Sequence, residues 1–251
     1  MNMQSNALRH EKVILITGAS RGIGAFTAKL LAQQGHHIIV NYASNAEEAN
    51  RVVQQIQTSG GMASAFQADV SQSAEVTLLF DYAIQTYGRL DVLINNAGIM
   101  RLSKIETLDD ESIERILAIN LKGSLYTMRE AAKRLEHGGK IINLSSSVVA
   151  MKLEGYGIYT ASKAAIESLT AILAKELRGK NISVNAIAPG PTATELFLEG
   201  KSDELIAKLS KAAPLERLGT VEDIAAVLDF AVNDASNWVN AQVLRVNGGI
   251  I

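Results

Sequence analysis

Tyr159 and Lys163 are the two residues whose types and spacing point most directly to chemistry. They lie four residues apart in YTASK, within a stretch of helical periodicity, so both side chains face one side of a helix. A tyrosine phenol normally has a pKa of about 10. A nearby ammonium favours the phenolate and lowers this pKa, which suits general acid–base catalysis. The alternative is a partly buried tyrosine beside a solvated lysine.

Three glycines, Gly18, Gly22 and Gly24, fall within seven residues in ITGASRGIGAF, directly after an apolar run. Their spacing, G-x-x-x-G-x-G, is neither the G-x-G-x-x-G dinucleotide fingerprint nor the lysine-containing phosphate loop. Glycines between a strand and a helix let the backbone turn sharply and approach a pyrophosphate at the helix N-terminus. We therefore expect a phosphate-binding turn, the alternative being an ordinary tight strand–helix turn.

The elements that must position these residues alternate regularly along the chain. Apolar, β-branched runs predict strands at 12–17, 37–42, 63–69, 90–98, 140–146, 182–190 and 242–249. Amphipathic runs predict helices at 23–35, 46–58, 72–87, 109–136, 157–178, 203–211 and 221–232. Strands that are apolar on both faces are typical of parallel strands covered by helices on both sides. The pattern predicts an α/β fold with one doubly wound parallel sheet in a single domain, 11–251, after a loose extension, 1–10.

Composition excludes several function classes. The net charge of −2 and the absence of a Lys/Arg block argue against nucleic-acid binding. The absence of cysteine excludes disulfides and thiolate metal sites, and the four histidines are not spaced for a metal. No apolar run approaches the roughly 20 residues of a membrane span, and no signal peptide is recognisable. We expect no membrane partner and a cytoplasmic location.

Four motifs in a specific order now identify a family. TGASRGIG (17–24), NNAG (95–98), YTASK (159–163) and APG (188–190) together resemble the short-chain dehydrogenase/reductase family over residues 11–251. The resemblance implies a Rossmann-type sheet of order 3-2-1-4-5-6-7, a nicotinamide cofactor, and a homotetramer or homodimer. The chain looks similar to 3-oxoacyl-acyl-carrier-protein reductases and related NADPH carbonyl reductases.

The resemblance adds two residues to Tyr159 and Lys163 as the catalytic set. Family spacing places the catalytic serine thirteen residues before the tyrosine, at Ser146, although the local pattern SVVA aligns equally with Ser147. That serine is expected to hold the substrate oxygen and stabilise developing charge. Asn120 matches the family's helix asparagine, which holds a water of the proton relay. A polar residue there also indicates a distorted helix or a buried hydrogen bond, and a purely structural asparagine is the alternative.

The cofactor is expected to be NADP(H). NAD sites in this kind of fold usually place an acidic residue at the end of the second strand. That position here is occupied by Asn41, Tyr42, Ala43 and Ser44, and the first acid, Glu47, already lies in a predicted helix. Arg21 supplies a cationic fork that suits a 2′-phosphate, the alternative being a solvated loop cation.

The remaining site residues follow from the family pattern and from the carboxyl ends of the predicted strands. The expected cofactor-binding residues are Gly18, Ser20, Arg21, Gly22, Ile23, Gly24, Asn41, Tyr42, Ala43, Ser44, Asp69, Val70, Asn95, Ala97, Gly98, Tyr159, Lys163, Pro189, Gly190, Thr192 and Thr194. The expected substrate residues are Ser146, Val148, Met151, Leu153, Tyr156 and Phe197. Residues 191–213 are expected to form a lid over the substrate.

These observations predict an NADPH-dependent oxidoreductase that transfers hydride to a small-molecule ketone, aldehyde or 3-oxoacyl substrate, with Tyr159 as the proton donor. The same machinery working as an NAD(P)-dependent alcohol or sugar dehydrogenase is the first alternative. A dinucleotide-binding regulator without chemistry is the second. The presence of all four catalytic residue types argues against the regulator.

Overall fold

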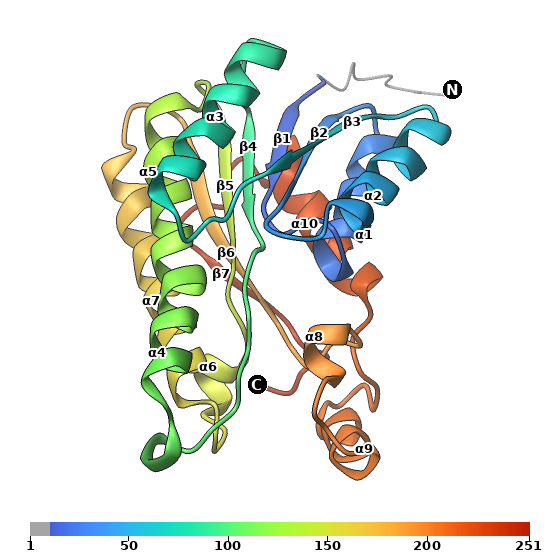
Figure 1. Cartoon of the computed structure of the whole chain (residues 1–251), viewed down its shortest axis with the longest axis vertical. Helices are drawn as coiled ribbons and strands as arrows, with labels where there is room; N and C mark the ends of the chain where they lie inside the picture. The colour runs from blue at the N-terminus through green and yellow to red at the C-terminus, as the bar shows by residue number, and fades with distance from the viewer. Residues whose placement is uncertain (1–10) are drawn as a thin grey trace.

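The computed structural model describes residues 11–251, and its centre is one parallel β-sheet (Figure 1). The predicted extension, 1–10, lies outside the described residues. The strands are β1 (Val13–Ile16), β2 (His37–Tyr42), β3 (Met62–Gln67), β4 (Val92–Asn95), β5 (Lys140–Leu144), β6 (Ser183–Pro189) and β7 (Val243–Val246). Their order is β3-β2-β1-β4-β5-β6-β7, so the predicted sheet and its topology are confirmed.

The strand order reverses at β1, and this reversal locates the site. Ile16 pairs with Val40 of β2 on one side and with Ile94 of β4 on the other. The chain leaves β1 and β4 in opposite directions across the sheet, which opens a crevice at their carboxyl ends. The glycine loop follows β1 directly, and the NNAG motif begins at the end of β4.

Helices cover both faces of the sheet (Figure 1). One layer contains α1 (Gly22–Gln33), α2 (Ala46–Thr58) and α10 (Val221–Val232), and the other contains α3 (Ser73–Tyr87), α5 (Ser124–Arg134) and α7 (Gly157–Glu176). Ile16 packs into the first layer and its neighbour Leu15 into the second, and both are fully buried. Burial of each such side chain stabilises the fold by roughly 1.5–3 kcal/mol. This is why the strands are apolar at consecutive positions.

The region expected as one helix, 109–136, has three parts. It consists of α4 (Asp110–Ile116), a π-helical segment η2 (Leu117–Gly123) and α5. Asp109 caps α4 by accepting a hydrogen bond from the backbone N–H of Ser112 at 2.7 Å. Asn120 lies in the π-helical segment and is fully buried. The helix distortion expected at this polar residue is therefore present.

The segment after β6 forms a separate projection beyond the carboxyl ends of the strands. It carries α8 (Glu195–Leu198) and α9 (Asp203–Ala212), opposite α4 and the short helix α6 (Val148–Met151) (Figure 1). Short 3-10 turns occur at η1 (Ile105–Thr107) and η3 (Asp234–Ser236). Among residues 11–251, no helix combines the length and apolar composition needed to cross a membrane. Within the same range, no cluster of His, Cys, Asp or Glu side chains is arranged to hold a metal ion.

Candidate active site

Two connected hollows lie at the carboxyl ends of the strands. We call them the outer cleft, beside the glycine loop and the end of β2, and the inner cavity, beside the three serines and α7. The residues that line both are Ile23, Asn96, Gly98, Thr194 and Leu196. A single elongated ligand can therefore extend from one hollow into the other.

The glycine loop forms one wall of the outer cleft, and its glycines are required by geometry. Gly18 and Gly22 adopt φ angles of +59° and +56°, where side chains are strained. A Cβ on Gly18 would also lie 2.8 Å from the Cα of Ala97, and one on Gly24 would lie 2.6 Å from the Nδ2 of Asn96. Gly24, expected to bind the cofactor, lines neither hollow. Its role is to let α1 pack closely against Asn96.

The two asparagines of NNAG have different roles, and this corrects one expectation. Asn95, expected to line the cofactor site, instead lies in the interior, where it donates to Asn143 at 2.9 Å and accepts from Thr127 at 2.6 Å. Asn96 lines both hollows and donates to the carbonyl oxygens of Thr17 and Gly18. Asn95 is the last residue of β4, and adjacent residues of an extended chain point to opposite sides.

The end of β2 forms the far wall of the outer cleft. Asn41 is buried and holds the glycine loop in place: its Oδ1 accepts from the N–H of Gly18 at 3.3 Å and its Nδ2 donates to Ala68 at 2.9 Å. Tyr42, Ala43 and Ser44 line the cleft as expected. The other expected cofactor residues that line the outer cleft are Ser20, Asp69, Val70, Ala97 and Gly98, and those that line the inner cavity are Pro189, Gly190, Thr192 and Thr194.

Charged residues in the outer cleft include two that sequence reasoning missed. Arg21 forms an ion pair with Glu195 of α8, with 3.0 Å between Nη1 and Oε2, and both side chains are largely exposed. Glu48, in the first turn of α2, and Arg115, in α4, also line the cleft. No local pattern marks Arg115 or the partner of Arg21, because both reach the cleft through the tertiary fold.

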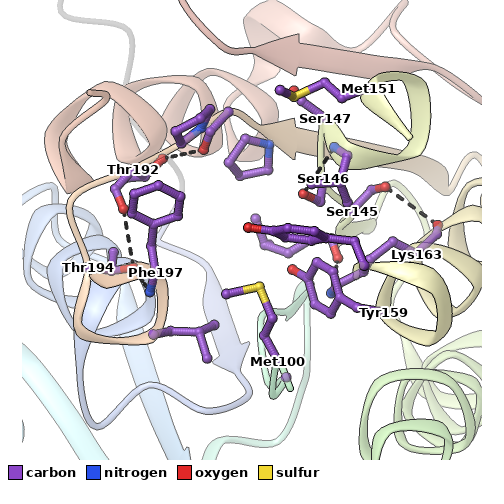
Figure 2. Close-up of a pocket in the computed structure, with 18 of the residues that line it drawn as sticks. Met100, Ser145, Ser146, Ser147, Met151, Tyr159, Lys163, Thr192, Thr194 and Phe197 are labelled. Carbon is purple, nitrogen blue, oxygen red and sulfur yellow. Dashed lines mark hydrogen bonds between the residues drawn. The ribbon is translucent and has the colours of Figure 1, made fainter. Parts of the chain in front are cut away.

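The structure distinguishes the three consecutive serines. Ser145 donates to the Glu167 carboxylate at 2.7 Å, and Ser147 donates to the Ala188 carbonyl at 3.1 Å. Ser146 is hydrogen-bonded to the Tyr159 phenol. Figure 2 shows Ser146 and Tyr159 on the same side of the cavity. Of the two serines left open by the sequence, Ser146 is therefore the one beside the tyrosine.

Tyr159 and Lys163 are both almost fully buried, at 8% and 5% exposure. The Lys163 Nζ donates to the Leu144 carbonyl at 2.7 Å and lies 5.7 Å from the centroid of the Tyr159 ring. Burial raises the pKa of Tyr159 to about 12, opposed by the Ser146 hydrogen bond, and burial lowers the pKa of Lys163 to about 8. The expected lowering of the tyrosine pKa is therefore absent here, because loss of water around the phenol outweighs the opposing effects.

Asn120 lies next to this pair. Its Oδ1 accepts from the N–H of Ile99 at 2.9 Å, and its Nδ2 donates to the Ile99 carbonyl at 2.9 Å. A Cβ on Gly98 would lie 3.4 Å from the Asn120 Oδ1 and 3.6 Å from the Lys163 Nζ. The fold therefore brings Asn120, Gly98 and Lys163 together, although Asn120 does not itself line either hollow.

The walls of the inner cavity are mostly apolar. All six expected substrate residues line it, and Figure 2 shows Phe197 across the cavity from Ser146 and Tyr159, with Met100 beside them. Met100 and Leu144 were missed from the sequence, whereas Pro191, Leu196 and Leu209 belong to the segment 191–213 that was expected over the substrate. Met100 lies two residues after NNAG, and this position is a signal for its place in the site. Lys163 is the one charged side chain among the described lining residues.

Comparisons with known proteins agree with this geometry. A family model described as enoyl-(acyl carrier protein) reductase matches residues 18–251. A short-chain type dehydrogenase/reductase of Picea abies is 47% identical, with 95% of this chain and 92% of the relative covered. An NADPH-dependent aldehyde reductase-like protein of Arabidopsis thaliana, described as chloroplastic, is 40% identical, with 96% and 94% covered.

Solved structures are similar across almost the whole chain. A dehydrogenase of Burkholderia cenocepacia with bound NADP has a TM-score of 0.91 and 30% identity, covering 96% of this chain and 93% of its own. A short-chain dehydrogenase/reductase of Serratia marcescens has a TM-score of 0.90 and 32% identity, covering 95% and 97%. With the motifs, sheet order and site geometry, these matches show that the chain belongs to the short-chain dehydrogenase/reductase family.

Proposed function

We propose that the protein is an NADPH-dependent oxidoreductase that reduces the carbonyl group of a small, uncharged, largely apolar molecule. One observation carries the proposal. Ser146, Tyr159 and Lys163 meet in an apolar cavity that continues into a glycine-walled cleft. A proton donor, a hydrogen-bond donor and a cation beside a nucleotide-shaped cleft are the groups that hydride transfer to a carbonyl needs.

The residues of the outer cleft fit a dinucleotide. Gly18 and Gly22 line the cleft without side chains, so their backbone is available to a pyrophosphate. Arg21, the N-cap residue of α1, lines the cleft, and its exposed guanidinium pairs with Glu195. When bound, NADPH supplies hydride to the carbonyl carbon. Relatives and a structural neighbour whose names specify NADPH or NADP support this choice.

The chain's own residues supply the proton. Tyr159 gives its phenolic proton to the carbonyl oxygen as the carbon accepts hydride, so the product is an alcohol. Ser146 donates a hydrogen bond to the same oxygen and stabilises its developing negative charge. The Lys163 ammonium stabilises the phenolate that remains, and Asn120 holds the loop after β4 against this centre through Ile99.

Reduction should lose activity as the pH rises through about 8. Lys163 carries its positive charge below its lowered pKa of about 8, whereas Tyr159 keeps its proton up to about 12. The lysine is therefore the first of the two to titrate, and losing its charge removes stabilisation of the phenolate. A pH profile of kcat/KM for carbonyl reduction measures the midpoint. A profile that stays flat to pH 10 would contradict this assignment.

The proposed function is tested by following NADPH oxidation with ketones, aldehydes, sugars and 3-oxoacyl thioesters, each repeated with NADH. We expect turnover of at least one neutral carbonyl compound and a preference for NADPH. Arg21→Gln should weaken NADPH binding about tenfold and NADH binding much less, because only NADPH carries the 2′-phosphate.

Glu195→Gln is the matched control for the cofactor prediction. It breaks the same Arg21–Glu195 ion pair from the other side but leaves the guanidinium in place. Calorimetric titration of both cofactors should show no loss of NADPH affinity in this variant. Equal or better turnover with NADH in the unmodified protein would rule out the NADPH preference.

Three further expectations remain part of the proposal. Residues 191–213 contribute Thr194, Leu196, Phe197 and Leu209 to the hollows, which supports their role as a substrate lid. Assembly into a homodimer or homotetramer is supported by exposed apolar side chains such as Leu125 on α5 and Ile172 on α7. A cytoplasmic location stays a prediction.

A further inference from the structure

Tyr156 occupies a distinctive place in the inner cavity. It precedes α7, three residues before Tyr159, and lines the cavity with only 8% of its surface exposed. Its phenolic oxygen has no hydrogen-bond partner within residues 11–251. Burial raises the pKa of Tyr156, so this hydroxyl keeps its proton and stays a donor.

The other lining side chains that carry donor groups each make at least one hydrogen bond. Ser146 and Tyr159 are hydrogen-bonded to each other. The remaining pairs, donor first, are Asn96–Gly18, Ser145–Glu167, Ser147–Ala188, Lys163–Leu144, Thr192–Gly190 and Thr194–Thr192. Among the described lining residues, Tyr156 is therefore the side chain with a donor group that makes no hydrogen bond to the rest of the protein.

Among the described residues, the buried side-chain polar atoms that lack a partner do not include the Tyr156 hydroxyl, so this hydroxyl is open to solvent and available to a ligand acceptor. We infer that the Tyr156 hydroxyl donates a hydrogen bond to a second oxygen of the substrate, separate from the carbonyl that is reduced. This inference rests on the proposed function and narrows its substrate class. The preferred substrates are neutral ketones or aldehydes that carry another carbonyl or a hydroxyl close to the reacting one.

The positions of the two tyrosines limit where that second oxygen lies. Residues three apart at a helix turn have Cβ atoms about 5–6 Å apart, so both phenols reach one small molecule. The second oxygen then lies close to the reacting carbonyl, for example on the adjacent carbon. The acceptor is neutral, because the described cavity lining places no cation beside Tyr156 other than Lys163, which the Leu144 carbonyl holds. The cavity encloses about 130 Å³, enough for a molecule about the size of one aromatic ring.

The test compares 2,3-hexanedione with 2-hexanone, using NADPH, in the unmodified protein and in Tyr156→Phe. Phenylalanine keeps the ring and removes only the hydroxyl. The ratio of kcat/KM for the dione to that for the ketone should fall about three- to tenfold in the variant. Intrinsic reactivity of the two compounds cancels in this comparison. Met100→Leu, which alters the apolar wall alone, is the matched control and should leave the ratio within about twofold.

An equal change for both compounds in Tyr156→Phe would show that the residue is only part of the wall, and the inference would be wrong. No change for either compound would overturn it as well, because a water molecule would then satisfy the hydroxyl. If the unmodified protein reduces neither compound nor any other carbonyl, the proposed function fails. In that case the dissociation constants of both compounds in the NADP⁺ complex are measured by calorimetry instead. The ratio of these two constants in Tyr156→Phe and in the unmodified protein then decides the role of Tyr156.

Discussion

Replacing Tyr159 by phenylalanine should lower the rate of carbonyl reduction by about 10²–10⁴-fold, because it removes the proposed general acid. The substitution keeps the ring that packs in a cavity wall where the residue is 8% exposed. Its hydroxyl makes one hydrogen bond within the described structure, to Ser146, so the fold loses little. Single-turnover oxidation of NADPH with the best carbonyl substrate measures the loss.

Cofactor binding separates loss of chemistry from loss of structure in this variant. The glycine loop and Arg21 lie in the outer cleft, which the Tyr159 side chain does not line. The dissociation constant for NADPH should therefore stay within about threefold of that of the unmodified protein. Turnover that is unchanged in Tyr159→Phe would refute the proposed mechanism. An equal collapse of binding and turnover would indicate a structural role instead.

Alanine substitutions of Ser146 and Ser147 should affect different properties, the first turnover and the second stability. Ser146→Ala should lower kcat about 10²–10³-fold, the usual cost of losing one donor to a developing oxyanion. Its hydroxyl faces Tyr159 and is only half-buried, so stability should change little. The measurements are kcat with the same carbonyl substrate and the midpoint of thermal unfolding.

Ser147→Ala should instead lower stability, by about 1–3 kcal/mol. Its hydroxyl is 2% exposed, donates to the Ala188 carbonyl and accepts from the Asn247 side chain at 3.1 Å. Alanine removes both hydrogen bonds, one of them to a carbonyl of the buried Ala188. Turnover per folded molecule should fall much less than in Ser146→Ala. The reverse pattern would make Ser147 the catalytic serine, the alternative that the sequence leaves open.

Local residue patterns account for much of the fold. Apolar runs between amphipathic stretches predict a parallel sheet covered on both faces, because strands such as VILI bury every residue. The end of α10 at Val232 agrees with the predicted boundary. The π-helical segment was anticipated only as a distortion at Asn120, and the short helices α6 and α8 were missed. These short helices bury little apolar surface of their own, so periodicity leaves no clear signal.

The motifs predicted the chemistry, and the tertiary structure decided which side chains meet. The sequence by itself identified Tyr159, Lys163 and the glycine loop, because helical spacing and strand–helix junctions are local features. Three outcomes needed partners far along the chain: Ser146 rather than Ser147 beside the phenol, Asn96 rather than Asn95 at the cleft, and Glu195 paired with Arg21.

Contacts between segments distant in sequence also explain the raised pKa of Tyr159 and the hydroxyl of Tyr156 that has no partner. The sequence places an ammonium near Tyr159 and predicts a lowered pKa, but burial by segments distant in sequence removes water and raises it to about 12. The tertiary structure likewise leaves Tyr156 as a donor without a partner in an apolar cavity. Spacing along the chain determines which side of a helix a residue occupies. Solvent exposure and hydrogen-bond partners depend on what the whole fold packs against it.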